Sequence, residues 1–279
     1  MHQRLDALKA VLTELGSVLV AFSGGVDSAV VARVAKDVLG EGAVALTAVS
    51  PTFPPEELAA AEAMTRAAGI RHILVDSHEL EREGYARNAG DRCYFCKTEL
   101  FELARDRAAT LGLAHVADGT ILDDLGGHRP GLKAAGEHAV RHPLVDAGFD
   151  KATVRAVARF YGLHVWDKPS FACLGSRFPV GTRVTEPRLR MVQGVESYLR
   201  VIGLRNFRAR WHEVEGKALC RIEVDVGSLE LLLRPGVREG LVEASEAEGF
   251  RWVTLDLMGY QAGSLSTALS STEATGSTL

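Results

Sequence analysis

The sequence has few cysteines, no long apolar run and no excess of positive charge, and each shortage excludes a class of protein. Four cysteines in 279 residues are too few for a fold held together by disulfides. No apolar run reaches the roughly 18 residues needed to cross a bilayer. Lys and Arg number 32 against 36 Asp and Glu, a net charge of −4, so the surface as a whole does not attract nucleic acid or an anionic membrane. We expect neither kind of partner.

The N-terminal segment also lacks the pattern of a secretory signal. Its apolar residues are interrupted by Asp6, Lys9 and Glu14, which leaves no unbroken hydrophobic stretch. The composition, 47% hydrophobic and 24% charged, is that of a globular protein. The length allows one large domain or two of roughly 150 residues. We expect a soluble protein of a reducing compartment, the cytoplasm.

The first half of the chain alternates short β-branched runs with longer helical patterns. This alternation is typical of βαβ units and predicts an α/β fold with a doubly wound parallel sheet. The polar, glycine-rich stretch 118–136 is expected to be an active-site loop with little regular structure. The expected strands are residues 17–22, 43–49, 72–75, 114–117 and 163–166, and the expected helices cover 55–68, 94–111 and 150–160, with one more that starts at Asp27.

A different pattern follows the stretch 167–187, in which three prolines and two glycines interrupt regular structure. We expect a first domain at 1–168, a smaller α+β domain for substrate binding or oligomerisation at 169–260, and a disordered Ser- and Thr-rich tail at 261–279. In the smaller domain the expected helices are 186–202, 229–233 and 237–246, and the expected strands are 207–211, 219–226 and 252–257.

A glycine turn joins the first expected strand to the first buried helix. Ala21 and Phe22 end the strand, and Ser23-Gly24-Gly25-Val26-Asp27-Ser28 follows. Two adjacent glycines let the backbone turn tightly with its N–H groups pointing inward, and the helix N-terminus adds a positive dipole end. The turn therefore predicts a phosphate site. It matches neither the GK[ST] loop nor the GxGxxG turn, and a plain glycine turn remains the alternative.

The motif SGGVDS closely resembles the pyrophosphate loop of the N-type ATP pyrophosphatases. The resemblance implies that the loop holds the β- and γ-phosphates of ATP with Mg²⁺, which Asp27 would reach through the phosphates. It also implies that a carboxylate or carbonyl oxygen is activated as an adenylate, with release of pyrophosphate. The nucleotide-binding residues would be Ala21, Phe22, Ser23, Gly24, Gly25, Asp27 and Ser28.

Three of the four cysteines are candidates for sulfur or metal chemistry. Cys93 and Cys96 form a CxxC at the start of an expected helix, and Cys173 lies in a loop 77 residues after Cys96. Cys220 shares one side of an expected strand with Ile222, Val224 and Val226, which favours a core position. Three thiols without a fourth suit an open iron–sulfur cluster or a redox set. An ordinary helix start and an unrelated cysteine remain the alternative.

Several further segments narrow the resemblance to the LarE family, ATP-dependent sulfur transferases that make the nickel-pincer cofactor of lactate racemase. The segments are CYFCKTELF, DGTILDD, RPGLKAA, CLGSR and TLDLMGYQAGS, and the likeness extends to about residue 264. The family converts the carboxylates of pyridinium-3,5-biscarboxylic acid mononucleotide to thiocarboxylates. The resemblance implies a homo-oligomer, a trimer of dimers. It also implies a [4Fe-4S] cluster on Cys93, Cys96 and Cys173, as in the three-cysteine branch.

Residues after the fourth expected strand are candidate nucleotide contacts, because ligands bind at this edge of an open α/β sheet. These are Asp118, Gly119 and Thr120. Ile121 stands where the family usually has Asn. Asp123 and Asp124 suit either a binding role or solvated loop positions.

The smaller domain contributes the remaining candidates. Glu196 lies within an apolar helical arc, where a carboxylate needs a partner or a role, and it matches an active-site glutamate of the family. Arg208 and Arg210 share one face of a strand and match the family's substrate-phosphate arginines; a solvated edge strand is the alternative. Ser176 and Arg177 follow Cys173 closely enough to orient it. Asp225 is a weaker candidate.

Three other functions remain open at this point. A tRNA thiolation enzyme combines the same loop with cluster-binding cysteines, but the net charge of −4 and the absence of a recognisable RNA-binding domain count against it. An ammonia-using synthetase would give the cysteines no role. A nucleotide-binding sensor without turnover is the alternative outside the enzymes.

Overall fold

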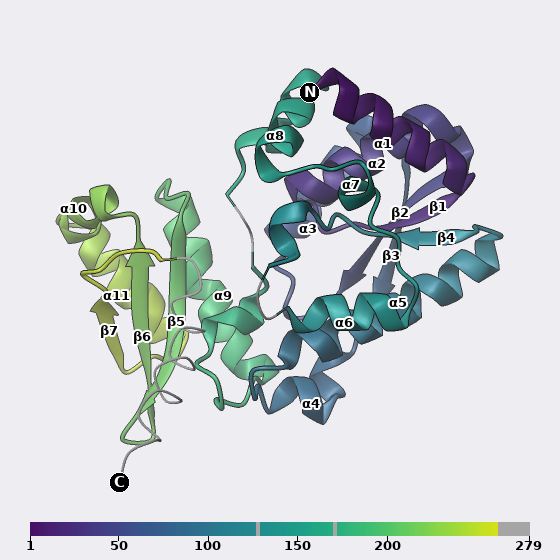
Figure 1. Cartoon of the computed structure of the whole chain (residues 1–279). Helices are drawn as coiled ribbons and strands as arrows, with labels where there is room; N and C mark the ends of the chain where they lie inside the picture. Colours follow the sequence, from purple (N-terminus) through teal and green to yellow (C-terminus); the bar gives the residue numbers. More distant parts are fainter. Residues whose placement is uncertain (127–128, 170–171, 262–279) are drawn as a thin grey trace, which may run out of the picture. The chain divides into compact units, whose positions relative to one another are not determined.

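The computed structural model describes residues 1–126, 129–169 and 172–261, and its chain forms two compact units (Figure 1). The first unit comprises Met1–Arg82 and Asp91–Phe171, and the second comprises Glu83–Gly90 and the chain from Ala172 on. One passage between the units thus falls inside the proline-rich stretch 167–187. No change of composition marks the passages at either end of Glu83–Gly90. The expected disordered tail lies outside the described residues, Gln261 excepted.

The first unit is built on a four-stranded parallel sheet, which confirms the predicted α/β class. Its strands are β1 (Val18–Ala21), β2 (Ala43–Val49), β3 (Arg71–Asp76) and β4 (His115–Ala117), in the order β3-β2-β1-β4. Strand β1 pairs with β2 on one side and with β4 on the other. The strand order therefore reverses between β1 and β4, and in open sheets of this kind ligands bind outside the carboxyl ends of the strands at that point.

Helices cover both faces of this sheet (Figure 1). Alternate side chains of β1 point to opposite faces: Val18 and Val20 join the core of α1, α2, α3 and α8, while Leu19 and Ala21 join that of α5 and α6. This is the doubly wound arrangement. The helices are α1 (His2–Leu15), α2 (Val26–Leu39), α3 (Pro55–Ala68), α5 (Arg92–Leu111), α6 (Pro130–Glu137), α7 (Pro143–Asp146) and α8 (Lys151–Phe160).

Two sequence predictions in the first unit are wrong. The expected strand 163–166 is instead a 3₁₀ helix, His164–Asp167. The segment begins with the turn that ends helix α8. Gly162 has a φ of +64°, and the N–H of Leu163 donates to the carbonyl of Ala158 at 2.9 Å. This helix-ending turn buries Leu163 against the core, which explains why the residue is apolar. The stretch 118–136 contains a 3₁₀ helix, Leu122–Asp124, and most of α6, which begins at Pro130 because proline suits the first helical position.

The second unit is the expected small α+β fold. Strands β5 (Phe207–Val214), β6 (Lys217–Val224) and β7 (Trp252–Leu255) follow that spatial order, with β5–β6 antiparallel and β6–β7 parallel. Cys220 is buried with Ile222 and Val224 as expected, but Val226 follows the strand and is exposed. The helices are α4 (Glu83–Ala86), α9 (Glu186–Val201), α10 (Leu229–Leu233) and α11 (Val237–Ala247).

The segment Glu83–Gly90 is tied into the second unit by Asn88. This residue is buried and has a φ of +53°, a left-handed conformation that asparagine tolerates. Its amide donates to the carbonyls of Pro179 at 2.8 Å and Thr182 at 3.2 Å, and the N–H of Val184 donates to the carbonyl of Ala86 at 2.8 Å. The chain then returns to the first unit immediately before α5. Within the described residues, no helix has the length and apolar content to cross a membrane.

We expect Gly119→Ala to destabilise the first unit. A Cβ at this position would lie 2.6 Å from the backbone nitrogen of Ser28 and 3.0 Å from the carbonyl carbon of Asp27, and backbone atoms cannot rotate away. The expected loss of unfolding free energy is about 1–3 kcal/mol, measured by denaturant titration. Gly136→Ala is the control, because its added Cβ meets nothing within 4 Å; equal stability of the two variants would contradict the prediction.

Candidate active site

The glycine turn leaves the carboxyl end of β1 and curls onto itself. Gly24 has a φ of +68°, and a Cβ there would lie 3.1 Å from the Cβ of Ala61. The Ser28 hydroxyl oxygen accepts the N–H of Ser23 at 3.3 Å and donates to the carbonyl of Gly25 at 3.1 Å. The first turn of α2 follows directly. Backbone N–H groups and a positive helix end thus gather at one point of the sheet edge, as an anion site requires.

Two lysines that the sequence interpretation missed reach this loop. The ammonium of Lys151 lies 2.8 and 2.7 Å from the two carboxylate oxygens of Asp27. The ammonium of Lys168 lies 2.6 Å from a carboxylate oxygen of Glu57 and 3.4 Å from the carbonyl oxygen of Gly24. The sequence offers one indication of a role for Lys151, because it is the first residue of α8, where the helix dipole disfavours a cation. No such indication exists for Lys168.

The segment after β4 packs against the start of α2 through Gly119. The buried Asp118 carboxylate accepts the N–H and hydroxyl of Thr120, at 3.0 and 2.9 Å, and meets Nδ1 of His142 at 2.7 Å. Burial acts to raise the pKa of Asp118, but the hydrogen bond with His142 and the charge of Lys97 outweigh it and lower this pKa. The same bond raises the pKa of His142. Asp118 and Gly119 therefore lie beside the glycine turn 23–28, called the phosphate loop below, at the β1–β4 edge.

The loop acids Asp123 and Asp124 have local partners. Asp123 accepts the backbone N–H of Lys151 at 2.8 Å, at the start of α8. Asp124 accepts the N–H of Ile121 at 3.2 Å and pairs with Arg129 at 3.3 Å. Both side chains hold the loop in place, and neither points to a binding role.

Cys93 and Cys96 lie on the first turn of α5. This helix follows β3 and leads to β4, so its N-terminus lies at the carboxyl edge of the sheet, the edge that carries the phosphate loop. Cys93 is exposed and Cys96 is partly exposed. A Cβ at Gly131 would lie 3.1 Å from Cγ of Lys97 and 3.8 Å from the carbonyl oxygen of Cys93. The CxxC turn therefore packs against the start of α6 within the first unit.

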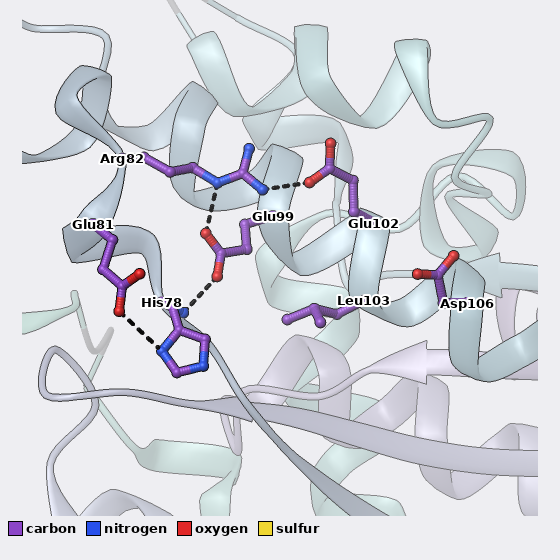
Figure 2. Close-up of a pocket in the computed structure, with 7 residues that line it drawn as sticks. All are labelled: His78, Glu81, Arg82, Glu99, Glu102, Leu103 and Asp106. Carbon is purple, nitrogen blue, oxygen red and sulfur yellow. Dashed lines mark hydrogen bonds and ion pairs between the residues drawn. The ribbon is translucent and has the colours of Figure 1, made fainter.

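Helix α5 is anchored to the end of β3 by a buried carboxylate. Glu99 accepts the Nε–H of Arg82 at 2.7 Å and the hydroxyl of Ser77 at 3.2 Å, and Arg82 also pairs with Glu102. Arg82, Glu99 and Glu102 line an open cavity of about 360 Å³, and Figure 2 shows the ion pairs among them. The cavity wall also carries the carboxylates of Glu81 and Asp106, an arrangement that disfavours an anionic nucleotide.

In the second unit, Arg177 holds the loop that carries Cys173. Its side chain is 1% exposed, and its guanidinium donates to both carboxylate oxygens of Glu196, at 2.7 and 2.9 Å. It also donates to the carbonyl of Ala172 at 2.7 Å, to that of Cys173 at 3.3 Å and to the Ser176 hydroxyl at 2.8 Å. Glu196 thus sits in a buried ion pair, the alternative to a catalytic role, and its part in catalysis stays a prediction.

Arg208 and Arg210 are buried rather than solvated, which rules out the alternative of a solvated edge strand. Arg210 donates to the carbonyl of Ser176 and to Glu223, both at 2.8 Å. Arg208 donates to the Tyr260 hydroxyl at 3.3 Å. Burial, followed by the charge of Arg177, lowers the pKa of Arg208. Arg177 and Arg210 thus pair with Glu196 and Glu223 beside the Cys173 loop, and Arg221 also pairs with Glu223 at 3.2 Å. Buried guanidinium groups of this kind suit the recognition of an anionic ligand.

The predicted residues fall into two groups. The first unit brings together 21–28, 118–120, Cys93 and Cys96, and the second brings together Cys173, Ser176, Arg177, Glu196, Arg208 and Arg210. Asp225 is exposed after β6, where it accepts the Asn206 amide at 3.0 Å. Among the residues that the structure describes, no three His, Cys, Asp or Glu side chains form a metal-binding group.

A glycine loop between the first strand and helix of a β3-β2-β1-β4 sheet defines a nucleotide-binding domain of the PP-loop type. Residues 1–107 match the family model described as NAD synthase. An uncharacterized Synechocystis protein is 42% identical over 96% of this chain and 99% of its own length. The pyridinium-3,5-bisthiocarboxylic acid mononucleotide synthase of Lactiplantibacillus plantarum is 36% identical over 94% and 93%. The chain belongs to the family of that synthase, the LarE family of sulfur-transferring PP-loop enzymes.

A more distant relative is the tRNA-specific 2-thiouridylase MnmA of Caulobacter vibrioides, 29% identical over 57% of this chain and 51% of its own length. This match covers only about half of either chain. It agrees with a shared nucleotide-binding domain.

The Asp118–His142 pair predicts a pH-dependent contribution to stability. The raised pKa of His142 means that its contribution is complete below about pH 6.5, its unfolded value, and is lost as pH rises through the folded value. The lowered pKa of Asp118 means that its contribution is complete above about pH 3.9 and is lost as pH falls. The pair therefore stabilises most between these limits.

His142→Asn should lower the unfolding free energy by about 1.5 kcal/mol at a pH near 5.5. The difference from the parent should shrink towards pH 9. Denaturant titrations at both pH values measure it, and a difference that stays constant with pH would contradict the assignment.

Proposed function

We propose that this chain is an ATP-dependent sulfur transferase that acts on pyridinium-3,5-biscarboxylic acid mononucleotide in the synthesis of a nickel-pincer cofactor. Each carboxylate attacks the α-phosphate of Mg·ATP to give an acyl adenylate and pyrophosphate. A hydrosulfide equivalent then displaces AMP to give the thiocarboxylate and one proton. The observation that carries the proposal is the phosphate loop at the β1–β4 edge, in a chain 36% identical over 94% of its length to a synthase of the thiocarboxylate product.

Within this proposal, residues 21–28 and 118–120 bind ATP, and Asp27 meets Mg²⁺ at the phosphates. Arg208 and Arg210 bind the substrate phosphate, for which a planar guanidinium is well suited. Arg177, Ser176 and Glu196 keep the Cys173 loop in position through the contacts described above.

Cys93, Cys96 and Cys173 would hold a [4Fe-4S] cluster, which supplies a sulfide-binding iron when it is present. The donor set fits on chemical grounds: Cys93 and Cys96 lie three positions apart on one helix turn, and both have solvent access. Gly90 is the last residue of the segment assigned to the second unit, and Cys93 and Cys96 follow it by three and six residues. Cys173 is the second residue after the passage at Phe171.

The proposal also includes a homo-oligomer, a trimer of dimers, in a cytoplasmic compartment that keeps thiols reduced. Apolar side chains exposed on the second unit support self-association. The most exposed are Val201, Val226, Leu233, Leu257 and Met258, at 84%, 64%, 62%, 81% and 71%.

Isotope exchange between pyrophosphate and ATP tests the adenylation step. We expect exchange that requires the dicarboxylate mononucleotide, and product masses that report one oxygen-to-sulfur replacement per carboxylate in a complete reaction. Asp27→Asn should lower the exchange rate roughly 100-fold, by analogy with loss of one preorganised charge contact. Exchange stimulated by tRNA and not by the mononucleotide would favour the thiolation alternative.

Iron and acid-labile sulfide content test the cysteine centre in protein purified without oxygen. About four irons per chain are expected, lost in Cys93→Ala, Cys96→Ala and Cys173→Ala. Cys220→Ala is the matched control, since this thiol is buried in the core and should leave the iron content unchanged. Iron-free parent protein that loses one sulfur from Cys173 during turnover would instead establish a sacrificial cysteine.

A further inference from the structure

The two lysines at the phosphate loop are each held by a carboxylate at the edge of the site. Lys151 binds both oxygens of Asp27, at 2.8 and 2.7 Å, and Lys168 binds Glu57 at 2.6 Å. The four side chains are between 11% and 35% exposed. Both cations are therefore within reach of solvent and of any ligand that enters the loop.

Helix α8 does not require the Lys151 side chain where it lies. Asp150 already caps this helix by accepting the N–H of Thr153 at 2.7 Å, and a cation at the first helical position is disfavoured by the dipole. An ion pair whose side chains are 35% and 26% exposed adds little to stability. The placement of Lys151 therefore calls for a reason other than folding, and its nearest functional group is the phosphate loop.

The two ion pairs together add no net positive charge to the loop. Two ammonium groups and two carboxylates sum to zero, and a pyrophosphate group would bring several negative charges against Asp27 and Glu57. Backbone N–H groups and the dipole of α2 supply only about half a positive charge. Binding becomes favourable if the lysines turn to the phosphate oxygens and a divalent cation takes their place at the carboxylate, as hard cations prefer.

We propose that Lys151 and Lys168 are pyrophosphate-binding side chains, held at the loop by Asp27 and Glu57 until the nucleotide arrives. When Mg·ATP binds, the Lys151 ammonium exchanges the Asp27 carboxylate for phosphate oxygens, and Asp27 turns to Mg²⁺. Lys168, already 3.4 Å from the Gly24 carbonyl, moves from Glu57 to the same phosphates. The proposal rests on the proposed function, since it assigns roles within its ATP site.

The exchange also bears on the adenylation step. As the α–β phosphate bond breaks, negative charge accumulates on the departing pyrophosphate. Lysines positioned on that group stabilise the charge as it develops. After release of pyrophosphate the carboxylates recapture the lysines, which restores the neutral loop.

Calorimetric binding of inorganic pyrophosphate to the full chain, with and without Mg²⁺, tests the exchange. Lys151→Met should weaken binding roughly 10- to 100-fold in both conditions, which is the loss of one charge-assisted contact. Lys168→Met should act in the same direction. The effect of Asp27→Asn on pyrophosphate affinity should depend on Mg²⁺. Without Mg²⁺ the variant should bind more tightly than the parent, because a negative charge is removed. With Mg²⁺ it should bind more weakly, because a metal contact is lost.

Lys36→Met is the matched control. Lys36 pairs with Glu41 at 2.6 Å, the same kind of contact, but ten residues further along α2 and hence about 15 Å from its start. Its pyrophosphate affinity should equal that of the parent. Lys151→Arg should restore part of the affinity, and thermal melting of each variant separates lost binding from lost folding.

Folded Lys151→Met protein that binds pyrophosphate as tightly as the parent would overturn the proposal. So would Asp27→Asn protein that binds more weakly whether or not Mg²⁺ is present, or a parent chain that binds no pyrophosphate. The proposed function fails separately: lysine-dependent binding of pyrophosphate without sulfuration of the mononucleotide would leave this proposal standing and refute the assignment of substrate.

Discussion

The close approach of the segment after β4 to the first turn of α2 governs the arrangement of the whole sheet edge. Neighbouring parallel strands lie only about 4.8 Å apart, so the segments that leave β1 and β4 must diverge or interlock. Here they interlock, since the space at Gly119 is occupied by the backbone of Asp27 and Ser28. The interlock brings Asp118 next to the phosphate loop, and the pairing of Ala117 with Arg141 then brings His142 to the same place. One missing side chain thus lets three separate segments form a single wall.

Both units contain ion pairs, but the second unit buries arginine–glutamate pairs whereas the first unit has partly exposed lysine–carboxylate pairs. In the second unit, Arg177 and Arg210 bind Glu196 and Glu223 in pairs that are at most 5% exposed, and the planar guanidinium satisfies several acceptors at once. Such pairs fix the position of a loop. In the first unit, compact lysine ammonium groups meet carboxylates that solvent can reach. These partly exposed contacts break and form again easily. Ion pairs therefore fix a loop in the second unit, whereas in the first unit they leave the lysines able to bind a ligand.

The sequence predicted those features that depend on neighbours along the chain. The glycine turn, the alternation of strands and helices, and the burial of Cys220 are local patterns, and the structure agrees with them. The strand expected at 163–166 failed because Leu163 is apolar for a different reason: it covers the end of α8. The burial of Arg208 and Arg210 could not be foreseen, because their partners Tyr260 and Ser176 lie 52 and 34 positions away in the sequence. The contact of Lys151 with Asp27 joins residues 124 positions apart, and no local pattern encodes it.

The excursion of Glu83–Gly90 into the second unit has a consequence for how the chain folds as it is made. The side-chain amide of Asn88 donates to the carbonyl of Phe178. Asn88 is synthesised 90 residues before Phe178. Helix α5 and strand β4 are synthesised in that interval. The segment Glu83–Gly90 therefore has no partners until residues 178–184 have been made. Pairing over such a sequence separation slows folding, and truncation after residue 168 would leave Glu83–Gly90 without its partners.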